Sequence, residues 1–108
     1  MLTNLFRQHI KCLGVFAFYQ SNIIPNMYYV YILHSEKFSK FYIGQTKDRS
    51  KRLKEHNAGH SKSTKAFRPW EIIWFCSKPT RSEAMVLERK LKNLNRERLL
   101  DFIEKYSN

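Results

Sequence analysis

The chain has 108 residues, a length that fits one domain, and 43% hydrophobic and 15% aromatic residues favour a folded globular protein over a disordered one. Lysine and arginine outnumber the acidic residues by 20 to 9, and the net charge is +11. Such an excess favours a polyanionic partner, first nucleic acid and second an anionic membrane surface, with a basic protein without such a partner as the alternative. No apolar run is long enough for a spanning helix. We expect neither a membrane nor a small-molecule cofactor.

The two cysteines and the first 26 residues bear on location and domain boundaries. Cys12 and Cys76 lie far apart and no CxxC occurs, so the expected compartment is a reducing cytoplasm. Residues 12–19 form an apolar run after basic residues, as in a signal peptide, but no A-x-A-like cleavage site follows. We therefore expect residues 1–26 to be an N-terminal extension, or an upstream addition to a protein that starts at Met27. A strand or helix packed on the domain is the alternative, and the domain itself is residues 27–108.

Two strands are predicted first. Aromatic and β-branched residues favour strands over 28–34 and 41–46, antiparallel to each other, with a polar turn at 35–40. Side chains alternate along a strand, so Tyr29, Tyr31 and Leu33 share one face and the residues between them share the other. Gly44 interrupts the second strand, which indicates a bulge or the close approach of a ligand backbone.

A basic helix is predicted over 48–58, capped by Thr46 or Asp48 and ended by Gly59. Its residues at spacings of three and four share one face. An amphipathic helix normally carries apolar groups there, but this face holds Arg49, Arg52, Leu53 and His56. Residues 60–68 follow as a basic loop with Lys62, Lys65 and Arg68, which suits phosphate contacts or, alternatively, simple solvation.

The remaining chain predicts a third strand over 70–77 and two helices. We expect Trp70 and Trp74 to lie in the core. Thr80 and Glu83 form a capping box that starts a helix, and Glu88 falls inside its apolar stripe of Ala84, Leu87, Leu91 and Leu94. A carboxylate there needs a charged partner or a metal, and a salt bridge to an arginine at the core edge is the alternative to a metal. Asn95 starts a last helix to Tyr106, with Leu99, Leu100 and Ile103 facing inward.

Together these elements predict an α+β fold with a small three-stranded antiparallel sheet flanked by helices, in the order β-β-α-β-α-α. The runs Tyr29-Val30-Tyr31 and Tyr42-Ile43-Gly44, followed by Arg52, His56 and Glu88, resemble the GIY-YIG nuclease superfamily in its small, single-domain bacterial form. The resemblance covers about residues 28–103. Tyr29 replaces the leading glycine of the family signature.

The resemblance implies a metal-dependent endonuclease that hydrolyses phosphodiester bonds in DNA, in repair or in the processing of structured DNA. Arg52 would bind phosphate oxygens as a planar fork, and Glu88 would bind the divalent metal, Mg²⁺ with Mn²⁺ as an alternative. The general base stays open among Tyr31, Tyr42 and His56. The expected backbone contacts come from Arg49, Lys51, Lys62, Lys65 and Arg68. The alternatives are a non-catalytic nucleic-acid-binding module on the same fold and a peripheral membrane protein that uses residues 1–26.

Overall fold

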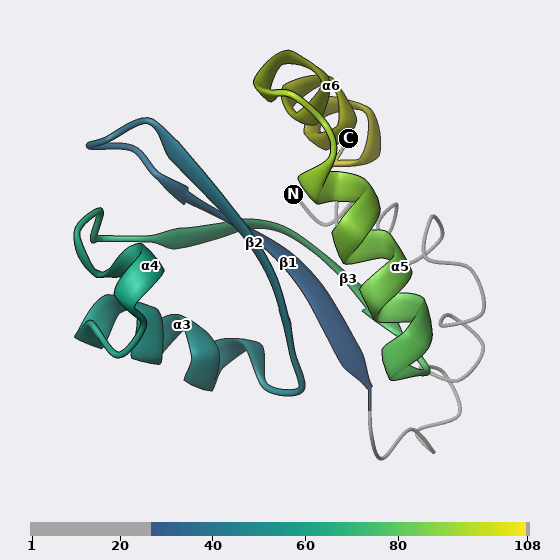
Figure 1. Ribbon diagram of the computed structural model, residues 1–108, viewed down its shortest axis with the longest axis horizontal. Helices are drawn as coiled ribbons and strands as arrows, with labels where there is room; N and C mark the ends of the chain where they lie inside the picture. The colour runs from purple at the N-terminus through teal and green to yellow at the C-terminus, as the bar shows by residue number, and fades with distance from the viewer. Residues whose placement is uncertain (1–26, 108) are drawn as a thin grey trace.

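The computed structural model describes residues 27–107, and the interpretation of residues 1–26 as an extension falls outside them. Three strands, β1 (Tyr28–Ser35), β2 (Lys40–Thr46) and β3 (Glu71–Lys78), form an antiparallel sheet in the order β2-β1-β3. The helices are α3 (Arg49–Ala58), α4 (Lys62–Lys65), α5 (Arg81–Lys92) and α6 (Arg96–Ser107) (Figure 1). The predicted α+β fold is therefore confirmed.

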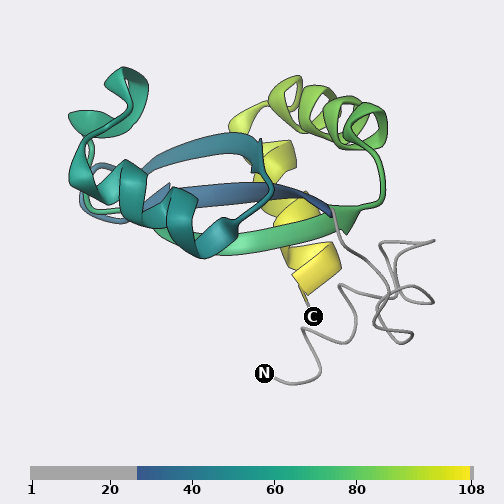
Figure 2. The same ribbon diagram turned by 90° about the horizontal axis from the view of Figure 1, so that it is seen from below.

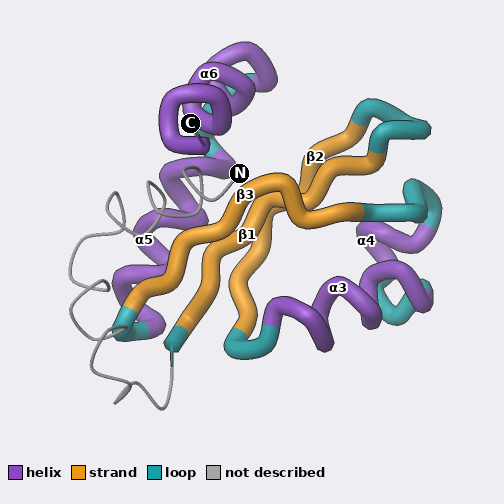
Figure 3. Tube along the Cα trace, turned by 180° about the vertical axis from the view of Figure 1, so that it is seen from behind, coloured by secondary structure: helices purple, strands orange, loops and turns teal. Residues whose placement is uncertain are grey.

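The sheet separates two pairs of helices. Helices α3 and α4 lie on one side of the strands, and α5 and α6 lie on the other (Figures 2 and 3). Each side buries its own set of apolar side chains, as the alternation of side chains along β1 requires. Val30 and Ile32 face α5, whereas Tyr31 and Leu33 face α3 and α4.

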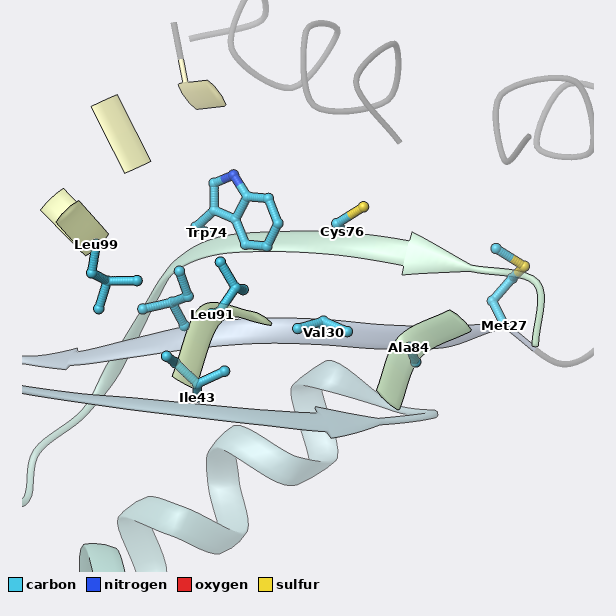
Figure 4. Packing of buried hydrophobic residues seen from close by; sticks show 9 residues of the cluster. Met27, Val30, Ile43, Trp74, Cys76, Ala84, Leu91 and Leu99 are labelled. Atoms are coloured by element: carbon cyan, nitrogen blue, oxygen red, sulfur yellow. The ribbon is translucent and has the colours of Figure 1, made fainter. Parts of the chain in front are cut away.

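The larger core lies under α5 and α6. Ala84 and Leu91 of α5 pack against Val30 of β1 and Ile43 of β2, and Leu99 brings in α6 (Figure 4). Complete burial of a leucine or isoleucine side chain stabilises a fold by about 1.5–3 kcal/mol. This layer therefore fixes α5 against the sheet and with it the position of Glu88.

A bulge between Ile32 and Leu33 sets the register of β1 against β3. Ile32 pairs with Trp74 and Leu33 pairs with Ile72, so one residue of β3 is skipped. Trp74 consequently enters the core under α5 and α6, while Trp70 joins Tyr31 on the opposite side. Both tryptophans are buried, as predicted, but in two different clusters.

The helix boundaries follow the predicted caps. The Asp48 carboxylate accepts a hydrogen bond from the Lys51 backbone N–H, and Gly59 ends α3 with a left-handed φ of 85°. Thr80 and Glu83 form the expected capping box at α5. At α6, Asn95 accepts from the Arg98 N–H at 2.8 Å.

Two local expectations differ from the structure. Residues 60–68 contain the short helix α4 rather than a loop alone, because Ser61 starts a turn whose carbonyl accepts from both Thr64 and Lys65. Leu100 is 45% exposed instead of buried. The inward stripe of α6 holds Leu99, Phe102 and Ile103, and Leu100 lies one residue, about 100° of helix rotation, away from Leu99. Within residues 27–107, no helix is long and apolar enough to cross a membrane.

Candidate active site

A buried chain of three polar side chains lies under α3 and α4. The Tyr31 hydroxyl lies 3.0 Å from His56 Nε2, and His56 Nδ1 lies 2.8 Å from Thr64 Oγ1. Tyr31 is 2% exposed, and His56 and Thr64 are fully buried. The chain therefore links β1, α3 and α4 through buried side chains.

Burial controls the protonation of this chain. Desolvation raises the pKa of Tyr31 to about 12, and the nearby Arg52 guanidinium opposes that rise. Desolvation also lowers the pKa of His56 to about 4, and the positive charge of Arg52 adds to that decrease. At neutral pH both Tyr31 and His56 are therefore uncharged.

Gly44 makes room for the Tyr31 phenol. The two residues are paired across β1 and β2, and a Cβ added at Gly44 would lie 2.7 Å from the Tyr31 hydroxyl oxygen. Any side chain at this position would collide with the phenol. The close approach expected at Gly44 is thus made by Tyr31 of the same sheet.

Tyr42 stands beside this chain and is partly exposed. Its ring centroid lies 5.0 Å from that of His56 and 6.5 Å from that of Tyr31. Of the three residues expected to include a general base, Tyr42 is the one whose side chain reaches solvent. His56 holds both ring nitrogens against protein groups, behind Tyr31.

Arg52 lies at the edge of the same cluster with about a third of its side chain exposed. Its guanidinium forms an ion pair with Glu55 at 2.9 Å, one turn along α3. The Glu55 hydrogen bond is the main cause of the raised pKa of Arg52, and the Tyr31 phenol also contributes. An ion pair this exposed is worth only about 0.2–1 kcal/mol, so an incoming anion could displace Glu55 at low cost.

Glu88 approaches from α5, on the other side of the sheet. Its side chain is 16% exposed and is held by Gln45 Nε2 at 2.7 Å and by Lys92 Nζ at 2.8 Å. The partner is Lys92 rather than an arginine at the core edge. Glu88 nevertheless lies close enough to the tyrosine cluster for its negative charge to raise the pKa of Tyr31, as the smallest of several causes. β2 is the edge strand of the sheet. The Glu88 carboxylate contacts β2 from the α5 side through Gln45, and the Tyr31 phenol lies over Gly44 of the same strand.

These positions can now be compared with known proteins. The family described as the GIY-YIG catalytic domain matches residues 27–101 of this chain. The chain belongs to the GIY-YIG family. The family interpretation made from the two tyrosine motifs is therefore confirmed, and the first motif is present here with Tyr29 in place of glycine.

Relatives named UPF0213 proteins align over most of the chain. The UPF0213 protein YazA of Bacillus subtilis is 38% identical over 84 residues, covering 77% of this chain and 84% of YazA. The solution structure of the UPF0213 protein BH0048 from Bacillus halodurans superimposes with a TM-score of 0.51 at 29% identity, covering 76% of this chain and 87% of that protein. The structural match supports the fold.

A larger relative carries a functional name. The structure-specific endonuclease subunit SLX1 of Scheffersomyces stipitis is 46% identical over 59 residues, which are 48% of this chain and 18% of SLX1. This chain therefore spans a small part of that protein's length.

The family signature maps onto both sides of the sheet edge. Tyr31 and Tyr42 come from β1 and β2, Arg52 and His56 come from successive turns of α3, and Glu88 comes from α5. Within residues 27–107, no group of three or more His, Cys, Asp or Glu side chains could hold a metal ion. Glu88 alone fits an ion that keeps most of its ligands as water or phosphate, as Mg²⁺ does.

The expected phosphate-contacting residues fall into two classes. Lys51, Lys62, Lys65 and Arg68 are exposed on α3, α4 and the segment after α4. Arg49 is instead half-buried, with its guanidinium 3.6 Å from the ring centroid of Phe75 and 4.7 Å from that of Tyr29. Stacking restricts Arg49, whereas the lysines are free to follow a nucleic-acid backbone.

Four polar partners in the site, Gln45, Glu55, Thr64 and Lys92, were absent from the sequence interpretation. Glu55 and Lys92 follow Arg52 and Glu88 at helical spacings of three and four, so the spacing rule for ion pairs on one helix would have found both. Thr64 has no such signal. It lies beyond Gly59, in a different helix from His56.

Proposed function

We propose that this chain is a metal-dependent endonuclease that hydrolyses phosphodiester bonds in DNA, in repair or in the processing of structured DNA. The observation that carries the proposal is the surrounding of the Tyr31 hydroxyl. It lies 3.0 Å from His56 Nε2, and the charges of Arg52 and Glu88 both act on its pKa. A phenol paired with an imidazole, a guanidinium and a carboxylate would supply a group that relays a water proton to His56, a phosphate-binding cation and a metal ligand.

Each residue has a distinct task in this proposal. Arg52 exchanges Glu55 for two phosphate oxygens, a geometry that suits its planar fork. Tyr42, which solvent reaches, positions the attacking water together with the Tyr31 oxygen. His56 orients Tyr31 from behind. Glu88 would hold a divalent ion, Mg²⁺ or Mn²⁺, in place of Lys92, and such an ion would supply charge stabilisation to the phosphate and the leaving oxygen.

The DNA backbone would run over the exposed lysines of α3 and α4, which carry no base specificity. The name of the SLX1 relative, a structure-specific endonuclease subunit, supports a branched or otherwise structured DNA substrate.

Nicking of supercoiled plasmid in the presence of Mg²⁺ or Mn²⁺ tests the proposal. We expect the wild type to cleave, and Glu88→Gln and Arg52→Ala to lose cleavage by two orders of magnitude or more, since charge stabilisation of this kind contributes about 10²–10³-fold. Glu97→Gln and Arg98→Ala, on α6, are matched controls that should cleave like the wild type. Cleavage by Glu88→Gln at the wild-type rate would contradict the mechanism.

A non-catalytic nucleic-acid-binding module remains the second candidate, and one observation favours it. Both oxygens of Glu88 already have protein partners, an amide and an ammonium group, so the carboxylate is satisfied without a metal. Tight binding to plasmid, duplex and branched DNA without cleavage of any of them would support this function instead.

A further inference from the structure

In the buried chain Tyr31–His56–Thr64, each proton must have an acceptor. This requirement indicates which atom carries each proton. Arg52 is near enough to act on the pKa of the Tyr31 phenol, but a guanidinium can only donate, so it cannot take the phenol proton. The Tyr31 proton must then go to another group. His56 Nε2, at 3.0 Å, is the partner that the described structure offers.

The second nitrogen of His56 leads to the same assignment. If Nε2 accepts from Tyr31, a neutral imidazole carries its proton on Nδ1 and donates it to Thr64 Oγ1 at 2.8 Å. Thr64 in turn donates to the Ser61 carbonyl at 3.5 Å. The Tyr31 hydroxyl, both ring nitrogens of His56 and the Thr64 hydroxyl then each have a hydrogen-bond partner. The opposite tautomer would direct Nε2–H at the Tyr31 oxygen and leave the buried phenol proton without this acceptor, at a cost of about 1–3 kcal/mol.

Further hydrogen bonds fix the position of Thr64 beside His56, so Thr64 can hold the imidazole in this tautomer. The Trp70 indole N–H donates to the Thr64 carbonyl at 2.9 Å, and Trp70 is itself fixed to α3 by two hydrogen bonds with Asn57. The short helix α4 is thereby anchored to both α3 and the start of β3.

We infer that Thr64 is a positioning residue, which holds His56 in the Nδ1–H tautomer so that Tyr31 donates its proton inward and turns its oxygen lone pairs toward Arg52 and the active site. The inference rests on the proposed nuclease function for its catalytic consequence. A phenol oriented this way accepts a hydrogen bond from water. As the phenol takes the proton of the attacking water, it passes its own proton to His56 Nε2, which leaves a neutral phenol and an imidazolium ion. With the opposite tautomer, Nε2 already carries a proton and cannot receive the phenol proton.

The tautomer can be measured without any enzymatic activity. In ¹⁵N-labelled full-length protein at pH 7, long-range ¹H–¹⁵N spectra distinguish a protonated from an unprotonated ring nitrogen, and the loss of signals in His56→Gln identifies His56. We expect protonated Nδ1 and unprotonated Nε2 in the wild type and in Thr64→Ser. A wild-type His56 with its proton on Nε2 would overturn the inference, whether or not the protein cleaves DNA.

Activity then tests the consequence. Thr64→Val keeps the shape of the side chain but removes the acceptor, so we expect a mixed or inverted tautomer and cleavage reduced by about 10- to 100-fold, the range found when a group that orients a functional histidine is removed. Thr64→Ser should restore both readouts, and Ser63→Ala, the neighbouring exposed hydroxyl, should cleave within about twofold of the wild type.

Different results would contradict the nuclease function and the role of Thr64. An unchanged tautomer and unchanged cleavage in Thr64→Val would contradict the role of Thr64 while leaving the nuclease intact. If the wild type cleaves no DNA, the proposed function fails, and the tautomer of wild-type His56 still decides the inference. The wild-type spectrum also decides it if Thr64→Val does not fold.

Discussion

The Tyr31 hydroxyl lies 3.0 Å from His56 Nε2 with both side chains buried, so one hydrogen bond joins the phenol and the imidazole inside the fold. This arrangement couples the site to the stability of the fold. Burial lowers the pKa of His56 from 6.5 to about 4, so the unfolded protein binds a proton more readily than the folded one between these values.

The free energy of unfolding should therefore fall as pH decreases through this range. The contribution of neutral His56 is complete above about pH 6.5 and is lost progressively toward pH 4, with a total of about 3 kcal/mol. Urea denaturation at pH 7, 5.5 and 4 measures it. His56→Asn, which does not titrate there, should show a shallower decrease, and equal slopes for both proteins would contradict the assignment.

Gly44 should tolerate no side chain while Tyr31 keeps its hydroxyl. In Gly44→Ala the new Cβ would lie 2.7 Å from that oxygen, and Tyr31 would have to move. Overpacking of this kind typically costs about 1–3 kcal/mol. In a double-mutant cycle, we expect Gly44→Ala to cost less in a Tyr31→Phe background, because one of the two close contacts is then absent. Additive effects would show that the clash is relieved elsewhere.

The sequence predicted the parts of the site that depend on one element at a time. The spacing of Arg52 and His56 places them on one face of α3, and the inclusion of Glu88 in an apolar stripe indicated a half-buried carboxylate. These inferences need only the helical repeat. The alternation along β1 likewise placed Tyr31 and Leu33 opposite Val30 and Ile32.

Relationships between elements were not predictable in the same way. Thr64 reaches His56 only because α4 folds back across the end of α3, and no periodicity relates residues on two sides of a left-handed Gly59. The strand register decides which side chain fills the space over Gly44, and the sequence alone did not define that register. The exposure of Leu100 depends on the rotation of α6 against the core, a property of packing rather than of composition.

The ion pair between Lys92 and Glu88 should weaken metal binding, because the ammonium group occupies the carboxylate oxygen that a divalent ion needs. Replacing Lys92 with methionine removes this competitor and keeps the length of the side chain. An ion pair with a largely exposed lysine contributes about 0.2–1 kcal/mol, so we expect Mn²⁺ affinity to rise by about two- to fivefold.

Isothermal titration with Mn²⁺ in the absence of DNA measures this change. Lys90→Met, on the same helix and exposed, is the matched control and should bind like the wild type. Glu88→Gln should abolish binding. If Lys92→Met leaves the affinity unchanged while Glu88→Gln abolishes it, the metal and Lys92 use different oxygens of the carboxylate.

The exposed lysines of α4 should contribute to DNA affinity by releasing counterions. Each phosphate that a protein cation neutralises adds about 0.9 to the steepness with which log K falls against log salt concentration on duplex DNA. Lys62→Gln and Lys65→Gln should each reduce this slope by about that amount and weaken binding equally for all sequences. Fluorescence anisotropy at four or more salt concentrations measures the slope. Lys105→Gln, on α6, removes the same charge from the other side of the sheet and should leave the slope unchanged. An equal effect from all three substitutions would mean that the net charge, rather than a backbone track over α4, sets the affinity.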